Sequence, residues 1–319
     1  MDNVYSDALE TVLRDRCTPA VARAIEAGGD AAALWEPLQQ SGFADSLRPE
    51  AGLSLRDVLP MLMAMGYHAL PVPLAQTMFA RALLDAAGVP VPETPIALAS
   101  FDGLSRTHAA DGAAATWFLV QQGGGAALAH RDTVDVRRTG VHGDLTVSLA
   151  RSAAQAFPLP PGTLRTIGAA MHAAQMAGAM ARVFDLTLQY ANDRTQFGRS
   201  IGKFQAIQHQ ISVMAEYVAA ARMAAQIACS VAGAMPDRMQ AAIGKFNASD
   251  AVVPVTSIAH AVHGAIGVTE EYELQRYTRR LHAWRVADGS DRYWAREIGR
   301  AACESDTTAV DTLRAWGDD

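Results

Sequence analysis

The feature that most constrains the fold is a long apolar periodicity in the second half of the chain. Apolar side chains recur every three or four residues at Phe204, Ile207, Ile211, Met214 and Val218. This spacing is typical of one face of an amphipathic helix. Helices are predicted over 163–192, 200–234, 237–262, 270–284 and 290–316. Helices of this length favour an antiparallel bundle in residues 159–319.

The first half of the chain is predicted to contain two further parts. Residues 1–92 form helices, the third of which begins after Ser54, a suitable N-cap. Residues 93–158 contain short apolar or alternating runs, at 96–100, 116–121, 126–130 and 145–149, which read as a small antiparallel sheet. Gly123, Gly124 and Gly125 lie between two such runs, so a hairpin turn is favoured over a phosphate loop. The predicted fold class is mainly α with a small β-domain.

Composition excludes several functional classes. The chain has 319 residues, half of them hydrophobic, and a formal net charge of −6 without a basic stripe, so nucleic acid is not an expected partner. Three scattered cysteines argue against a disulfide framework. The charged N-terminus does not resemble a signal peptide, and no apolar run reaches the roughly 20 residues of a membrane span. The dispersed histidines give no metal-site spacing. The expected location is the cytoplasm.

Arg194 is the first candidate for a binding role. Gly198 and Gly202 follow it and are expected to end the preceding helix, which places Arg194 at a corner between two helices. An arginine fixed at such a corner suits a diphosphate or a carboxylate, because its planar fork donates two parallel hydrogen bonds. Pairing with a surface acid explains the spacing equally well, so both interpretations remain open.

Two motifs carry a resemblance to a known family. The first is R-x-Q-F-G-x-x-I-x-x-F-Q-x-x-Q, from Arg194 to Gln208, and the second is HGAIGVTEEYELQRYTRR, from His263 to Arg280. In this order and at this separation they resemble acyl-CoA dehydrogenases. The resemblance implies an N-terminal helical domain, a β middle domain, a C-terminal four-helix bundle, and FAD as cofactor. The residues that it assigns to the adenine side of FAD are Arg194, Gln196, Phe197, Ile201, Phe204, Gln205, His263, Gly264 and Gly267.

The family also implies a carboxylate base, often a Glu in Y-E-G-T. Counting from Gly264 without gaps, the corresponding segment is A-D-G-S, with Asp288 in place of Glu. Asp288 is a solvated turn residue, a base for an unusual substrate, as in the related nitroalkane oxidases, or a weakened form of the usual base. Some family members place the Glu on the first long helix of the bundle instead, but no Asp or Glu lies between Pro161 and Phe184. His172, in the same apolar helix, is expected to be a core or interface residue.

Several departures from the family pattern occur together. The β-domain is short, its flavin-ring motif W-I-T/S-N/S-G is missing, and Ala261 and Ala265 replace a Gln and a Gly of the second motif. These losses resemble the degenerate subunit of the α2β2 steroid-type enzymes. The leading hypothesis is a subunit that contributes adenine-side FAD contacts while a homologous partner supplies the catalytic Glu for α,β-desaturation of a bulky acyl-CoA, such as a steroid side-chain thioester. The alternatives are a homo-oligomeric flavoenzyme that uses Asp288, and a non-catalytic helical assembly scaffold.

One further pattern concerns the second motif. Tyr272, Arg276, Arg279 and Arg280 recur on one side of a predicted helix. A solvated or salt-bridged face is the ordinary explanation for such a cluster, with subunit contact as a second role.

Overall fold

A computed structural model of the chain describes residues 4–101, 105–139, 143–149 and 156–317. The N-terminal part contains five helices. These are α1 (Val4–Arg16), α2 (Pro19–Glu26), α3 (Ala32–Gln40), α4 (Leu55–Tyr67) and α5 (Leu74–Ala86), with short 3-10 turns at Phe43–Asp45 and Pro49–Ala51. Ser54 caps α4 as predicted: its hydroxyl accepts from the backbone N–H of Asp57, whose carboxylate in turn accepts from the N–H of Ser54.

The β part contains two small sheets. The first has the strand order β1 (Ile96–Ser100), β3 (Trp117–Gln122), β4 (Gly125–His130), β7 (Ala156–Pro158), and the second has β2 (Arg106–Ala109), β6 (Leu145–Leu149), β5 (Val134–Arg138). Short 3-10 turns lie at Gly112–Ala114 and Arg131–Thr133. Phe101, Phe118 and Val147 belong to the apolar cluster shared by the two sheets.

The β part differs from its prediction in the number of its sheets, two instead of one, and in the direction of one strand pair. β1 pairs with β3 in parallel, Ile96 opposite Trp117, so the first sheet is mixed rather than antiparallel throughout. The chain leaves the first sheet after β1 to form β2 in the second, and returns to β3 in the same direction. The hairpin turn at Gly123 is confirmed: its φ is +58°, and it joins antiparallel β3 and β4.

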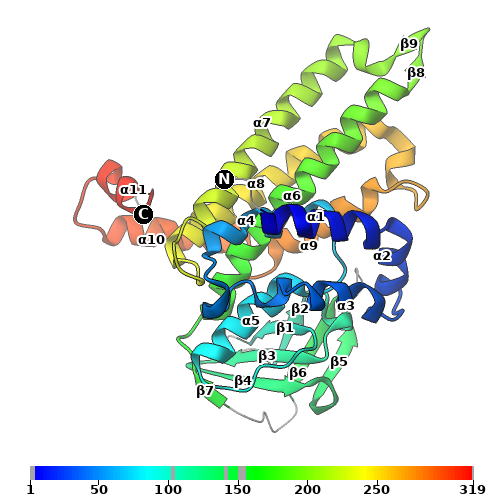
Figure 1. Cartoon of the computed structure of the whole chain (residues 1–319). Helices are drawn as coiled ribbons and strands as arrows, with labels where there is room; N and C mark the ends of the chain where they lie inside the picture. Colours follow the sequence, from blue (N-terminus) through cyan, green and yellow to red (C-terminus); the bar gives the residue numbers. More distant parts are fainter. Residues whose placement is uncertain (1–3, 102–104, 140–142, 150–155, 318–319) are drawn as a thin grey trace.

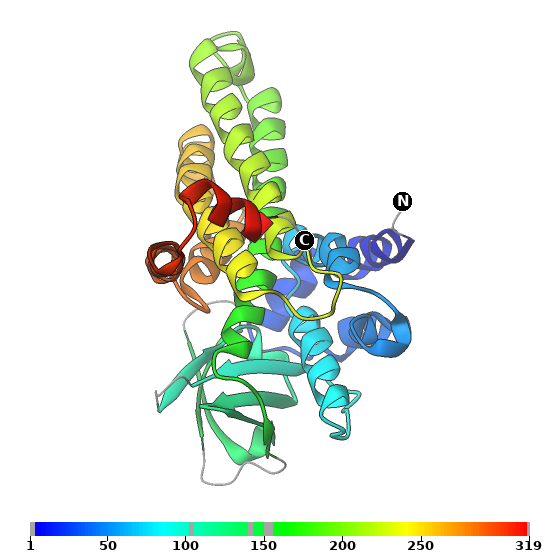
Figure 2. The same cartoon turned by 90° about the vertical axis from the view of Figure 1, so that its left-hand side faces the viewer.

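The C-terminal part is the predicted helical bundle. It contains α6 (Thr163–Asp193), α7 (Gln205–Ala228), α8 (Arg238–His263), α9 (Leu274–Val286), α10 (Asp291–Glu304) and α11 (Ala309–Gly317), with 3-10 turns at Ile201–Lys203 and Gly264–Val268. A two-stranded hairpin, β8 (Thr195–Gln196) and β9 (Arg199–Ser200), joins α6 to α7. α6 runs from the β part through the bundle, and the α6–α7 pair projects well beyond the other helices in both views (Figures 1 and 2).

The N-terminal helices and the bundle share one continuous apolar core. Close backbone contact between α4 and α6 holds them together: a Cβ on Gly66 would lie 2.0 Å from the carbonyl oxygen of Gln175, and a Cβ on Gly178 would lie 1.9 Å from that of Met63. The division into residues 1–92, 93–158 and 159–319 therefore stays a prediction. The segment Arg238–Val268 is long and apolar enough to span a membrane by composition alone, but α8 packs against α6 and α7 within the bundle.

Candidate functional site

A cavity of about 370 Å³ lies between the β part, the first turns of α6 and the loop that joins α9 to α10. Its wall is unusually rich in ionisable groups. Arg106 and His108 come from β2, Arg165 and His172 from α6, and Asp288 from the α9–α10 loop. The cavity therefore combines a carboxylate with cationic and imidazole groups, although these residues lie far apart in the sequence.

Asp288 lies in a turn, as its sequence context predicted. Its φ is +52°, and that of Gly289 is +97°. The loop is fixed from the α10 side, where the indole N–H of Trp294 donates to the carbonyl oxygen of Asp288 (3.0 Å) and Ser290 caps the helix. A non-glycine residue in the left-handed region is uncommon and indicates a constrained position. The turn presents the Asp288 carboxylate to the cavity rather than only to solvent.

Two residues of α6 surround the Asp288 carboxylate. A Cβ on Gly168 would lie 2.2 Å from its Oδ2 atom, so the glycine leaves the space that the carboxylate occupies. His172 is buried and stacked against Trp284, and its Nδ1 approaches Oδ2 of Asp288 to 3.1 Å, although the angle is not that of a regular hydrogen bond. Burial lowers the pKa of His172, an effect that Asp288 opposes only in part. The imidazole is therefore neutral at pH 7.

Gly168→Ala tests how tightly this contact is built. The added methyl group must push the Asp288 loop away from α6, so we expect a loss of about 1–3 kcal/mol in unfolding free energy, measured by chemical denaturation. Gly299→Ala is the matched control, because Gly299 is an exposed glycine in α10 with open space around its Cβ direction. That substitution should be neutral or stabilising. Equal effects of the two changes would contradict the packing described here.

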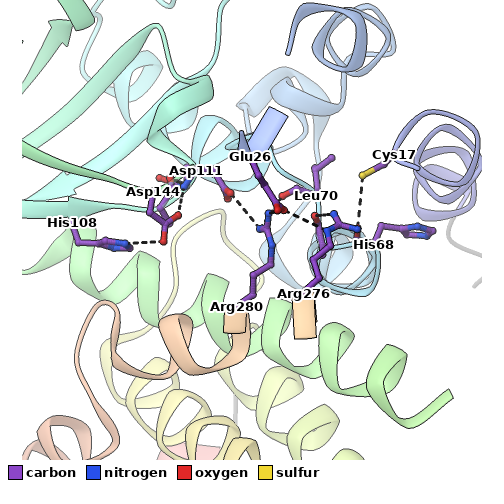
Figure 3. A network of polar contacts seen from close by, with 12 residues as sticks. Cys17, Glu26, His68, Leu70, His108, Asp111, Asp144, Arg276 and Arg280 are labelled. Carbon is purple, nitrogen blue, oxygen red and sulfur yellow. Dashed lines mark hydrogen bonds and ion pairs between the residues drawn. The ribbon is translucent and has the colours of Figure 1, made fainter. Parts of the chain in front are cut away.

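A buried polar network connects the cavity to the N-terminal helices (Figure 3). The Arg280 guanidinium of α9 lies 2.6 Å from Glu26 of α2 and 3.3 Å from Asp111, which follows β2. The backbone N–H of Asp111 donates to Asp144 (2.9 Å), and Asp144 pairs with His108 at the cavity wall (3.0 Å). The network thus joins all three parts of the chain.

Burial sets the electrostatics of this network. It raises the pKa of Asp111 to about 7, against the opposing charge of Arg280. Burial alone would lower the pKa of Arg280, but Asp111 and Glu26 raise it above its ordinary value. In the same way burial opposes protonation of His108, while its hydrogen bond to Asp144 raises its pKa overall. His108 therefore carries more positive charge at neutral pH than an isolated histidine.

Of the two forms predicted for the α9 arginine face, solvated or salt-bridged, the structure shows the salt-bridged one for two arginines, and these are buried. Arg276 and Arg280 are each only 2% exposed. Arg276 donates to the carbonyl oxygen of Ala69 (3.0 Å) and lies 3.4 Å from Glu26. Their shared partner Glu26 lies 250 and 254 residues earlier in the chain, so the local charge pattern carried no sign of their burial.

The first motif lies at the projecting tip of the α6–α7 pair. Phe197 and Gly198 form the two-residue turn between β8 and β9, with φ values of +51° and +79°, as in a type I′ hairpin. Phe197 is 91% exposed. Arg194 follows the last residue of α6 and makes no ion pair with any residue that the structure describes. Both interpretations of Arg194, ligand binding and pairing with a surface acid, stay predictions.

The remaining residues of the first motif continue from the tip into α7. Gln196 and Gln205 are exposed, while Ile201 and Phe204 are half-buried at the base of the hairpin. The second motif lies close by: His263 ends α8 and stacks on Tyr190, near the end of α6, at a ring distance of 4.5 Å. Gly264 adopts φ +65° and ψ −144°, a conformation reserved for glycine, and Gly267 lies in the following turn. The two motifs are therefore brought together, whereas Asp288 lies with the cavity at the other end of α6.

Neither Gly168 nor the network was identified from the sequence. The absence of Asp and Glu between residues 161 and 184 predicted only that α6 supplies no alternative base. The same absence also leaves room for the Asp288 carboxylate. Among the described residues no group of three or more His, Cys, Asp or Glu side chains is arranged to hold a metal ion.

Comparison with known proteins agrees with this architecture. Residues 165–303 match the family model described as "Acyl-CoA dehydrogenase, C-terminal domain". Acyl-CoA dehydrogenase IpdE2 of Mycolicibacterium smegmatis is 32% identical over 266 residues, which cover 78% of this chain and 81% of that protein. The solved Tcur3481-Tcur3483 steroid ACAD is similar in fold, with a TM-score of 0.80 and 23% identity over 94% of this chain and 96% of that one. The solved ChsE4-ChsE5 complex of Mycobacterium tuberculosis is also similar in fold, with a TM-score of 0.78 and 21% identity over 96% of this chain and 99% of that one. The chain therefore belongs to the acyl-CoA dehydrogenase family.

Proposed function

We propose that this chain is a subunit of an FAD-dependent acyl-CoA dehydrogenase whose cofactor sites are completed by a homologous partner chain. The observation that carries the proposal is Phe197. A bulky aromatic residue held at positive φ and left 91% exposed at a projecting tip is unfavourable in an isolated chain, both in backbone energy and in exposed apolar area. Contact with a second chain and its cofactor offsets both costs.

The residues at the tip fit the adenine and diphosphate half of FAD. Arg194 has a guanidinium without an acidic partner among the described residues, and bidentate binding of phosphate is its usual role. Gln196 and Gln205 add exposed amides, and Gly264 leaves open space where a side chain would otherwise stand. The Nε2 atom of buried His263 has no hydrogen-bond partner among the described residues. Ala265 remains a departure from the family pattern.

We further propose that Asp288 accepts the proton from the carbon next to the thioester carbonyl. FAD supplies the hydride acceptor for the neighbouring C–H when it is bound. Loss of the proton to the Asp288 carboxylate and of the hydride leaves the α,β double bond, with no other reactant. Asp288 is suited to this step because it faces the cavity, and because neutral His172 contacts it without neutralising its charge.

A second candidate is that the partner supplies the catalytic carboxylate and that the cavity of this chain takes no part in the reaction. It is favoured by Arg106 and His108 of β2, which line the cavity with cationic and imidazole groups, and by the missing flavin-ring motif. Under either candidate we propose a bulky acyl-CoA substrate, by analogy with the steroid enzymes of similar fold, and a cytoplasmic location. A scaffold without cofactor is the third candidate.

Co-purification with a homologous partner subunit tests these proposals. We expect flavin absorbance and dehydrogenase activity in the complex, and Arg194→Ala should weaken FAD binding by roughly 10- to 150-fold through loss of a charge-assisted hydrogen bond. Arg222→Ala, an exposed arginine of α7, is the control. Unchanged flavin content in Arg194→Ala would contradict the role of the tip in FAD binding. A complex without flavin absorbance would support the third candidate, a scaffold without cofactor.

A further inference from the structure

Lys245 is a buried cation in the middle of α8 that the function above does not use. Only two of the 27 basic residues of the chain are lysine, Lys203 and Lys245. Lys245 is completely buried. An apolar residue at this position would cost less free energy on folding, because transfer of an ammonium group out of water is unfavourable. Its presence at this position therefore requires a specific explanation.

The contacts of Lys245 lead to the loop that carries Asp288. Its Nζ donates to the carbonyl oxygens of Trp284 (2.5 Å) and Arg285 (3.1 Å) and approaches the Ser249 hydroxyl at 3.4 Å. The two carbonyls belong to the last turn of α9, where helix geometry leaves carbonyl groups without partners. The compact ammonium group has three protons for these three acceptors, which a planar guanidinium would not match. Lys245 thus fixes the end of α9 immediately before the turn.

The charges around Lys245 also converge on Asp288. Asp288 and Asp291 stabilise the cation and Arg285 opposes it. Arg285 is itself paired with Asp291 at 2.7 Å, and neutral His172 lies on the side of α6. Asp288 is therefore the facing carboxylate that no arginine neutralises among the described residues.

We propose that Lys245 is a positioning residue for catalysis: its hydrogen bonds to the last turn of α9 hold the α9–α10 turn so that Asp288 faces the cavity. This inference rests on the proposed role of Asp288 as proton acceptor.

The free-energy cost of burying Lys245 distinguishes a positioning role from a purely structural role. Burial lowers its pKa from 10.5 to about 7. Because the folded chain holds this proton less tightly than the unfolded chain, Lys245 lowers the free energy of unfolding by its full amount below about pH 7, and by progressively less as the pH rises toward 10.5. Replacement by an apolar residue removes this penalty, although it leaves the two α9 carbonyls unpaired. A residue retained only for stability would not be expected to carry such a penalty.

The test uses Lys245→Met and Lys245→Gln in the FAD-loaded complex, with kcat, KM and the Tm as readouts. Methionine removes the hydrogen-bond donor, whereas glutamine keeps donor hydrogens. We expect kcat to fall about tenfold for methionine and less for glutamine, because a displaced Asp288 carboxylate removes the proton more slowly. KM and the Tm should stay close to those of the parent.

Thr187→Val is the control, because it removes a buried hydroxyl that donates within α6, to the carbonyl oxygen of Val183. It should leave kcat and KM unchanged. An unchanged kcat in both Lys245 variants, while Asp288→Asn is inactive, would overturn the positioning role alone. Full activity of Asp288→Asn would overturn the role of Asp288 and this inference together. A lowered Tm with an unchanged kcat would assign Lys245 to structure only.

Discussion

Asp288→Asn is expected to lower kcat/KM of the FAD-loaded complex by about 10²- to 10⁴-fold. The amide has the shape of the carboxylate but does not accept the α-proton at neutral pH. Asparagine also tolerates the left-handed conformation that Asp288 adopts at φ +52°, so the turn and its contacts should survive. The loss should appear in single-turnover reduction of the flavin by acyl-CoA, with flavin content unchanged.

Two further variants make the interpretation of this result secure. Asp288→Glu extends the carboxylate by one methylene toward Gly168 and His172, so a partial rate with a changed chain preference is expected if the site is catalytic. His172→Gln should change the pH profile without abolishing activity, because the imidazole only contacts the carboxylate. An Asp288→Asn complex that reduces its flavin at the parental rate would place the base in the partner chain.

Glu26→Gln is expected to lower the free energy of unfolding by about 3–5 kcal/mol, because it leaves buried cations without their anion. Glu26 contacts both Arg276 and Arg280, whose side chains are almost fully buried. The neutral amide accepts a hydrogen bond but does not compensate two desolvated guanidinium groups. Chemical denaturation of the purified complex, followed by circular dichroism, measures the change.

The matched control is Glu297→Gln, which removes an acid that pairs with partly exposed Arg238 at 2.6 Å. Solvent screens that pair, so a change of no more than about 1 kcal/mol is expected. Similar losses for the two variants would mean that the network in Figure 3 contributes no more than a surface ion pair.

The helices were predictable because their information is local. Ser54 is three residues from Asp57, with which it forms the capping box, and the apolar period after Phe204 repeats within one helix. The strands β2 and β5 of the second sheet were not predicted. They carry charged residues, such as Arg106 and Arg137, at exposed positions, so their sequences show no apolar run. Their strand character depends on pairing with β6 rather than on their own composition.

The candidate site was only half predictable for the same reason. Asp288 was found by counting from a motif, and Arg194 by its position at a corner. Gly168 and Lys245 gain their significance only when the α9–α10 loop packs against α6 and α8, and nothing in their own neighbourhood indicates this. Arg280 was predicted on a solvated or salt-bridged face, and its burial was not predicted because its partners, Glu26 and Asp111, lie in other parts of the chain.

The length of α6 has a consequence for counting cofactors. Arg194 follows Gly168 by 26 residues, so the helical rise separates the cavity from the tip by roughly 39 Å. Under the proposed function, a dinucleotide that binds Arg194 of this chain at its adenine end would place its reactive ring in the cavity of a neighbouring chain. Each chain would then take part in two cofactor positions, once by each end of α6. A flavin-to-protein ratio of one per pair of unlike chains would mean that only one of these positions is filled, and a ratio of two would mean that both are.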